Sequence, residues 1–135
     1  MLRYMLDTNI LIYTIKNKPQ AVRQQFEQHH GEMCTTSVTA MELLFGAHNS
    51  QAVRRNLEAV ESLLGRIDVL DFDISAAEHS GQIRATLAQR GTPIGPYDTM
   101  IAGHARSRGL TLVTNNVSEF ERVSGLRLEN WAAPR

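Results

Sequence analysis

Short apolar runs alternate along this chain with longer segments whose apolar residues recur at helical spacing. The short runs predict strands, because four or five residues are too few for a buried helix, and they lie at 2–6, 33–36, 67–70 and 110–113. The periodic segments predict helices at about 9–16, 20–30, from 37 or 39 onward, 50–65, 75–90 and 97–108. Strands that alternate with helices are typical of a parallel sheet covered on both faces. We therefore expect an α/β fold with a central parallel sheet of about four to five short strands flanked by helices.

Capping residues indicate where the predicted helices begin. Thr8 or Asn9 can cap the first helix with a side-chain oxygen, and Ser37 or Thr39 can cap the third. Pro96 suits the first turn of the helix that it opens.

Composition restricts the class of protein. The chain has 135 residues, of which 42% are hydrophobic and 21% charged, and this predicts a single globular domain over residues 1–135. The 14 Lys and Arg residues balance the 14 Asp and Glu residues, so no overall basic field indicates a nucleic-acid partner. Acids clustered in one site can nevertheless be balanced by basic residues around its rim.

Cysteine content and hydropathy indicate the compartment. The single cysteine, Cys34, excludes an internal disulfide and suits a reducing environment. We see no secretory leader and no apolar run as long as a membrane span. The sequence therefore predicts a cytoplasmic protein without a membrane partner.

An acidic residue stands at the end of the first predicted strand. Asp7 follows an apolar run, where an unpaired carboxylate resists desolvation. Asp7 could simply cap the first helix. A carboxylate at this position also becomes favourable if a cation or a phosphate ester lies above it. In parallel α/β sheets the ligand crevice lies beyond the carboxyl ends of the strands. Residues 114–116 follow another predicted strand, so the two turns are neighbours if their strands are adjacent.

Three further acids occupy positions where a purely structural role is strained. Glu42 lies among apolar residues of its helix, Asp98 lies in the first turn of the helix at 97–108, and Glu119 follows the turn at 114–116. Each also has an ordinary explanation. Glu42 could be a solvated residue at the edge of an apolar stripe, Asp98 a partner of the helix dipole, and Glu119 a surface acid.

If these acids converge with Asp7, electrostatics limits what the site can be. Two unit charges about 5 Å apart repel by roughly 3 kcal/mol at an effective dielectric near 20. Either some carboxyls are protonated or a divalent cation is bound. Oxygen ligands without a His or Cys cluster favour Mg²⁺ or Mn²⁺ over Zn²⁺. Such a cation can hold a water nucleophile and neutralise a phosphodiester transition state.

Four motifs, in order along the chain, resemble those of a PIN domain. They are Leu6-Asp7-Thr8-Asn9, Ser37-Val38-Thr39-Ala40-Met41-Glu42-Leu43, Asp98-Thr99-Met100-Ile101-Ala102 and Leu112-Val113-Thr114-Asn115-Asn116. The resemblance covers essentially the whole chain and implies a PIN-like, Rossmann-like α/β fold. It is strongest with the VapC toxins of bacterial type II toxin–antitoxin modules, particularly those with a segment like Gly95-Pro96-Tyr97-Asp98.

The resemblance implies site residues position by position. Asp7, Glu42 and Asp98 match the catalytic, metal-site acids of the family. Many PIN domains carry a further Asp where this chain has Asn116. We therefore expect Glu119 to supply the fourth acid, with Asn116 as the alternative, neutral ligand. Four supporting residues complete the expected site: Thr8, Asn9, Thr114 and Asn115.

The resemblance also implies an activity and partners. The activity is that of a Mg²⁺- or Mn²⁺-dependent endoribonuclease that cuts the anticodon stem-loop of initiator tRNA. A cognate antitoxin neutralises the toxin, and a homodimer forms within the complex, which contacts operator DNA only through the antitoxin. Apolar faces of the first two helices and of the 50–65 helix are implied to serve these interfaces. Contacts to RNA phosphates would come from rim cations, although each candidate is more often an ordinary solvated charge: Lys16, Lys18, Arg84, Arg90, Arg106 and Arg108.

Two other classes of protein remain open at this point. A catalytically weak PIN-like module could bind RNA or a partner without cleavage, although three of the expected metal-site acids are present. A phosphatase of the haloacid dehalogenase type would use Asp7 as its nucleophile. That chemistry wants a second Asp two residues on, where this chain has Asn9.

Overall fold

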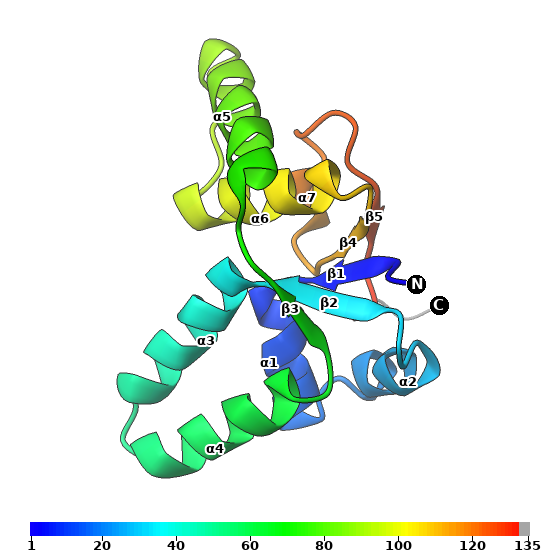
Figure 1. Cartoon of the computed structure of the whole chain (residues 1–135), viewed down its shortest axis with the longest axis vertical. Helices are drawn as coiled ribbons and strands as arrows, with labels where there is room; N and C mark the ends of the chain where they lie inside the picture. Colours follow the sequence, from blue (N-terminus) through cyan, green and yellow to red (C-terminus); the bar gives the residue numbers. More distant parts are fainter. Residues whose placement is uncertain (133–135) are drawn as a thin grey trace.

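Five short strands form one parallel sheet at the centre of the computed structural model, which describes residues 1–132 (Figure 1). The strands are β1 (Tyr4–Leu6), β2 (Met33–Thr36), β3 (Asp68–Leu70), β4 (Thr111–Val113) and β5 (Leu128–Glu129). Their order across the sheet is β3-β2-β1-β4-β5, and every pairing between neighbours is parallel. The predicted α/β class and number of strands are confirmed. The first strand is central, with β2 on one side and β4 on the other.

Seven helices lie within residues 1–132. They are α1 (Thr8–Lys16), α2 (Gln20–Gln28), α3 (Ser37–His48), α4 (Val53–Leu64), α5 (Ile74–Gln89), α6 (Pro96–Ser107) and α7 (Val117–Phe120). Six of these helices, α1 to α6, were predicted. Each predicted helix end lies within three residues of the end in the structure. The short elements α7 and β5 were not predicted.

Side chains of the strands alternate between two covered faces of the sheet. Tyr4 and Leu6 belong to a core with α1, α2, α3 and α4, whereas Met5 belongs to a second core with α5, α6 and α7. Met5 lies in register with Cys34 of β2 and Leu112 of β4, which belong to the same core. Figure 1 shows α5 and α6 on one side of the sheet and α1 on the other. The central strands β1 and β2 are buried along their whole length, because both of their faces are covered.

The caps of α1 and α3 differ from the prediction. Asp7 caps α1, and its Oδ1 accepts a hydrogen bond from the backbone N–H of Ile10 at 3.0 Å. Thr36 caps α3 in the same way, with 3.3 Å between its Oγ1 and the backbone N of Val38. Each strand runs directly into its helix. The extended residue that a cap requires is therefore the last residue of the strand or the one after it. The predicted caps, one to three residues further on, were wrong.

Helix α6 is fixed between two other elements. A methyl group added at Gly103 would lie 2.0 Å from Ser80 Oγ, so α5 and α6 are in close contact. The neighbouring His104 is fully buried, and its Nδ1 lies 2.7 Å from Oγ1 of Thr36 at the start of α3. Asp98 lies in the first turn of the same helix, so this packing also positions one of the candidate acids.

Several side chains outside the candidate site have structural roles. Cys34 is fully buried, and burial raises the pKa of its thiol to about 12. Trp131 is buried and stacks on His29, with 5.2 Å between ring centroids. Arg106 was a candidate for RNA contact, and its guanidinium Nε donates to His79 Nδ1 at 3.0 Å, so this side chain also links α6 to α5. Among residues 1–132, no helix combines the length and the apolar character needed to cross a membrane.

Candidate active site

The carboxyl ends of β1 and β4 lie side by side and bring Asp7 next to Thr114. The two strands pair with Leu6 in register with Val113, and the backbone N–H of Asp7 donates to the carbonyl of Val113 at 3.0 Å. The hydroxyl of Thr114, which is fully buried, lies beside the Asp7 carboxyl group and favours its charged form. The expectation that these two turns are neighbours is confirmed.

Asp7 is a buried carboxylate whose charged form is disfavoured. Its side chain is only 5% exposed, and this burial raises its pKa to about 6. Hydrogen bonds from the Thr114 hydroxyl and the Ile10 N–H act in the opposite direction, and the charge of Glu42 adds to the rise of the pKa. The strain expected of an acid at a strand end is therefore present.

Glu42 reaches the same region from α3 and is held there by α1. The hydroxyl of Thr8 donates to Glu42 Oε1 at 2.7 Å, and Thr8 Oγ1 also lies 3.3 Å from Thr39 Oγ1. A hydroxyl has one hydrogen to donate. The shorter bond to the carboxylate uses the hydrogen of Thr8, so the Thr39 hydroxyl is the donor in the longer one.

Asp98 brings a third carboxyl group from α6. Burial raises its pKa to about 7, and the charges of Glu119, Asp7 and Glu42 add to this rise. The other three acids are therefore close enough to Asp98 for their charges to raise its pKa, although the four come from four separate segments. This arrangement fits the cluster of acids that the sequence predicted.

Glu119 and Asn116, between which the sequence did not decide, contact each other. Glu119 Oε1 accepts from the backbone N–H of Gly95 at 3.2 Å, and its Oε2 accepts from the side-chain amide of Asn116. The backbone N–H of Asn116 donates to Thr114 Oγ1 at 2.9 Å. Both residues therefore lie at the candidate site, with Glu119 beside Asp98.

The four acids fit a divalent cation in their chemistry. Within residues 1–132, no group of three or more acidic, His or Cys side chains is arranged to hold a metal ion as it stands. Glu42 and Glu119 are turned to protein donors, and burial raises the pKa values of Asp7 and Asp98. A bound cation would favour the charged form of both groups, and a set of oxygen donors is what Mg²⁺ and Mn²⁺ prefer.

The supporting residues are distributed around these acids, and two more were missed. Asn9 is exposed on α1, and Asn115 donates from Nδ2 to the Tyr13 hydroxyl at 3.2 Å and accepts at Oδ1 from Asn130 Nδ2 at 3.3 Å. Neither Tyr13 nor Asn130 belongs to the motifs that predicted the site. Tyr13 lies in an apolar helical run, and Asn130 follows a strand of two residues, so no periodic pattern predicts their proximity to Asn115.

Comparison with known proteins agrees with this fold. The chain belongs to the PIN domain family, which matches it over residues 4–126. It is 62% identical over 132 residues to a Shigella flexneri protein named tRNA(fMet)-specific endonuclease VapC, a match that covers 98% of this chain and 100% of that protein. It is 50% identical over 131 residues to Ribonuclease VapC2 of Haemophilus influenzae, covering 97% of this chain and 99% of that protein.

Solved structures give the same result. A chain in the structure described as "Crystal structure of DNA bound VapBC from Salmonella typhimurium" is 58% identical, with a TM-score of 0.93, and the match covers 97% of this chain and 99% of that one. A chain of VapBC2 from Rickettsia felis, bound to a DNA fragment from its promoter, is 35% identical with a TM-score of 0.91, covering 96% and 99%. The resemblance indicated by the four sequence motifs is confirmed.

Proposed function

We propose that this protein is the toxin of a type II toxin–antitoxin module and cleaves tRNA as a metal-dependent endoribonuclease. The observation that carries the proposal is the 62% identity, over nearly the full length, to a protein named tRNA(fMet)-specific endonuclease VapC. The proposed substrate is the anticodon stem-loop of initiator tRNA, and the proposed place of action is the cytoplasm, where this RNA is used. The whole chain is proposed to act as one PIN domain.

The carboxylates divide into two pairs in the proposed mechanism. Asp7 and Asp98 would hold a Mg²⁺ or Mn²⁺ ion, together with water. When bound, the ion supplies positive charge to the phosphodiester and lowers the pKa of the attacking water. Glu42 and Glu119 flank this pair and can accept the proton that the water loses. Thr8 keeps the carboxylate of Glu42 oriented through its hydroxyl hydrogen bond.

A cleavage assay tests activity, substrate and metal separately. Purified protein, freed of antitoxin, is incubated with transcripts of initiator and elongator methionine tRNA in Mg²⁺, Mn²⁺ or EDTA, and the cut ends are mapped. We expect one cut in the initiator transcript, no cut in EDTA and no cut with Asp7→Asn. Cleavage in EDTA contradicts the metal, equal cleavage of both transcripts contradicts the substrate, and an inactive wild-type protein contradicts the nuclease.

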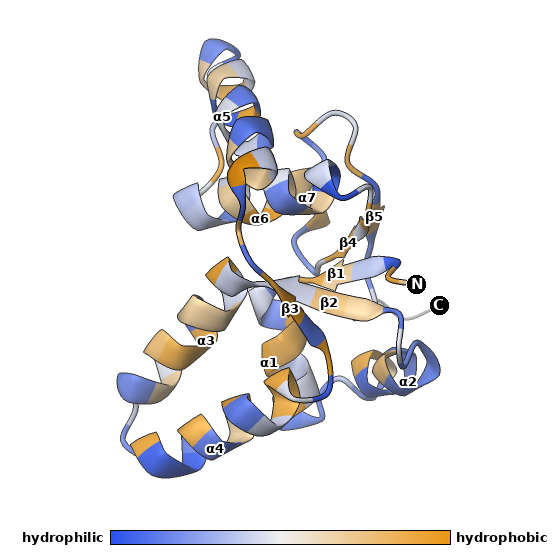
Figure 2. Ribbon diagram, viewed as in Figure 1, coloured by the Kyte–Doolittle hydropathy of each residue, from blue (hydrophilic) through white to orange (hydrophobic). Residues whose placement is uncertain are grey.

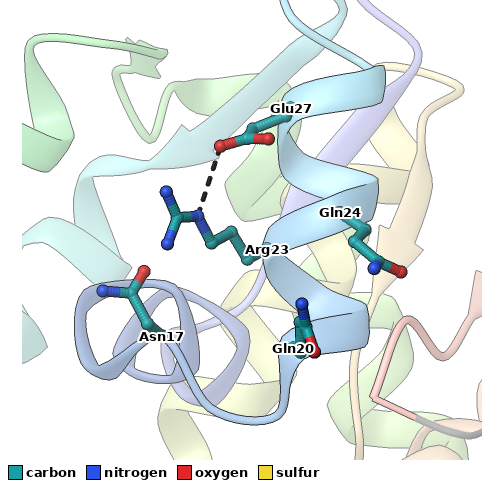
Figure 3. Close-up of a pocket in the computed structure, with 5 residues that line it drawn as sticks. All are labelled: Asn17, Gln20, Arg23, Gln24 and Glu27. Atoms are coloured by element: carbon teal, nitrogen blue, oxygen red, sulfur yellow. Dashed lines mark hydrogen bonds and ion pairs between the residues drawn. The ribbon is translucent and has the colours of Figure 1, made fainter.

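We propose a cognate antitoxin as the partner, because solved neighbours are described as VapBC complexes. The surface of α1, α2 and α4 offers two adjoining hollows for it. One of about 540 Å³ is lined by Asn17, Gln20, Arg23, Gln24 and Glu27 (Figure 3). The second, of about 350 Å³, shares Arg23 with the first and adds Phe26 and Leu63. Arg23 pairs with Glu27 at 3.2 Å, so the hollows combine apolar and charged positions, which suits an amphipathic segment. Operator DNA would be contacted through this antitoxin.

We also propose that two copies of the chain associate within that complex. Phe45 and Met41 of α3 are 64% and 41% exposed, and Ile74 of α5 is 75% exposed. Figure 2 shows hydrophobic residues along α3. Exposed apolar side chains of this size suit an interface between subunits. Light scattering of wild type and Phe45→Asp would test the interface, and we expect the variant to have the smaller mass.

A further inference from the structure

We propose that Tyr13, Asn115 and Asn130 form a neutral donor rim that binds acceptor atoms of the RNA strand beside the cleaved phosphodiester. The proposal rests on the proposed nuclease function and deepens it. It identifies residues by which an acidic site can hold a polyanion. We refer to these three side chains as the donor rim.

The donor rim is continuous with the carboxylate site but contains no acid. Asn115 stands between the two residues whose side chains contact Asp7 and Glu119. Asn130 follows β5, which pairs with β4 at the same edge of the sheet. Tyr13 lies on α1, the helix that Asp7 caps. Three segments that are distant in sequence therefore place uncharged polar groups around the turn at 114–116, which borders the cluster of acids.

The backbone fixes the direction of the hydrogen bonds in the donor rim. The N–H of Ala132 donates to Oδ1 of Asn130 at 2.9 Å, and that position requires an oxygen because a backbone N–H cannot accept. Nδ2 of Asn130 therefore faces Asn115 and donates to its Oδ1 at 3.3 Å. Nδ2 of Asn115 in turn donates to the Tyr13 hydroxyl oxygen at 3.2 Å. Both amide orientations thus follow from one backbone group.

This direction leaves donors available to a ligand. An amide Nδ2 carries two hydrogens, and the network described above uses one from Asn115 and one from Asn130. The Tyr13 hydroxyl accepts in this network, so its own hydrogen can be donated outward. Asn115 is exposed, and the other two side chains are half-buried. The rim therefore presents two N–H groups and one O–H group.

Neutral donors suit RNA at this position. Phosphate oxygens and base carbonyl oxygens are acceptors, and the acids of the site repel the phosphates before a cation is bound. A lysine here would pair with those acids, whereas an amide or a hydroxyl can bind an acceptor oxygen without doing so. The ring of Tyr13 also offers a flat surface on which a base can stack. The ligand is therefore an acceptor oxygen of a nucleotide next to the cut, on its phosphate or on its base.

Two substitutions of nearly unchanged shape test the donor rim. Tyr13→Phe removes the O–H group and keeps the ring. Asn115→Asp keeps the size of the side chain, replaces the donor by an acceptor and adds one negative charge. Ser118→Asp adds the same charge at an exposed position of α7, outside the rim, and is the matched control.

Binding and cleavage are measured separately. The dissociation constant of a labelled tRNA stem-loop is determined by fluorescence anisotropy with proteins that also carry Asp7→Asn, and kcat and KM are determined without that change. Because one hydrogen bond is involved, we expect Tyr13→Phe to raise Kd and KM about two- to tenfold. For Asn115→Asp we expect a rise of about tenfold or more. For Tyr13→Phe, kcat and the unfolding midpoint should stay near those of the wild type, and Ser118→Asp should bind like its parent.

Two results would overturn the proposal. If Kd and KM are unchanged while the unfolding midpoint falls, the network only ties β5 to α1. If Ser118→Asp weakens binding as much as Asn115→Asp, charge alone explains the loss. The lack of any cleavage by the wild type contradicts the nuclease instead, and the Kd comparison is independent of it.

The source of the acceptor oxygen is found with modified RNA. A methylphosphonate at the flanking phosphate removes the effect of Tyr13→Phe if that phosphate is the ligand. A change of the flanking base removes it if a base carbonyl is the ligand. Either result supports the donor rim, whereas an effect that neither change alters overturns it.

Discussion

The Thr8 hydroxyl donates a hydrogen bond to the carboxylate of Glu42, with 2.7 Å between Oγ1 and Oε1. The two residues are 34 positions apart in the sequence and belong to α1 and α3, which follow neighbouring strands of the sheet. A hydrogen bond to a charged group is stronger than one between neutral groups. The bond therefore sets the direction in which Glu42 presents its second oxygen to the site.

Replacement of Thr8 by valine should lower cleavage while the fold is kept. Thr8→Val preserves the branched shape but removes the donor, so Glu42 loses its fixed direction, and we expect kcat/KM for the tRNA substrate to fall by about tenfold. Thr8→Ser keeps the hydroxyl and should retain most of the activity. Equal activity of Thr8→Val and wild type, at equal stability, would show that this bond is not needed.

Replacement of Asp7 by asparagine should abolish cleavage and raise stability. The pKa of Asp7 rises from 3.8 to about 6 in the folded protein, so its ionisation at neutral pH opposes folding. We expect Asp7→Asn to raise the free energy of unfolding at pH 7.5 in EDTA by roughly 2–3 kcal/mol. Asparagine caps helices as well as aspartate does, so α1 keeps its cap.

Asp73 provides the matched control for this substitution. It caps α5 through a hydrogen bond from the Ala76 N–H at 2.9 Å, and it is exposed. Asp73→Asn should change the free energy of unfolding by about 0.5 kcal/mol or less. A loss of stability in Asp7→Asn, measured by urea unfolding, would contradict the account of Asp7 as a strained acid.

Without metal, the protein should become less stable as the pH rises toward neutrality. Burial raises the pKa values of Asp7 and Asp98 from 3.8 to about 6 and about 7. The folded state therefore holds protons that the unfolded state has already released, and the stability present below about pH 4 is lost as the pH rises through 6 and 7. In EDTA, we expect the unfolding temperature to fall between pH 5 and pH 7.5, by an amount that other titrating groups modify.

Divalent cations should reverse this loss, because they replace the protons between the acids. Mn²⁺ or Mg²⁺ should therefore raise the unfolding temperature more at pH 7.5 than at pH 5. The pH dependence should be weaker in the double variant with Asp7→Asn and Asp98→Asn. The same pH dependence in the double variant and the wild type would assign it to other groups.

A single methyl group at Gly103 should separate α5 from α6. The added Cβ would meet Ser80 Oγ at 2.0 Å, its backbone N at 2.7 Å and its Cα at 2.8 Å. Because two of these atoms belong to the backbone, the helices must move apart. We therefore expect Gly103→Ala to lower the free energy of unfolding by at least about 1–3 kcal/mol. Ser80→Ala should not restore it.

Gly46 of α3 gives the control for this change. It is helical as well, but an added Cβ would have no other atom within 4 Å. Gly46→Ala should therefore gain up to about 1 kcal/mol from helix propensity. Equal effects at the two glycines in thermal unfolding would show that α5 and α6 do not approach as closely as described.

Much of the fold could be predicted because its signals are local. The strands are short apolar runs, and both faces of the sheet are covered, so the runs need no alternation to be recognised. Asp7 could be singled out because a charge at the end of such a run is unfavourable by itself. Glu42 and Asp98 could be placed near it only through the motifs that resemble those of PIN domains.

The rest depends on contacts that no single segment contains. The α7 helix has four residues and β5 has two, too few for any periodic pattern. Asp7 was interpreted as a candidate ligand more than as a cap, yet it bonds to the Ile10 N–H in the first turn of α1. The orientation of Asn115 depends on Tyr13 and Asn130, which lie 102 and 15 positions away.

The central place of β1 in the sheet determines when the site is completed during synthesis. A chain grows from its N-terminus, so β1 is made well before its neighbour β4, which begins only at Thr111. A nascent chain that ends before β4 contains Asp7, Glu42 and Asp98 but lacks the Thr114 hydroxyl and Glu119. Asp7 thus waits for a strand that begins more than a hundred residues later. In the proposed toxin, the site of a growing chain is therefore incomplete until β4 and α7 have been made.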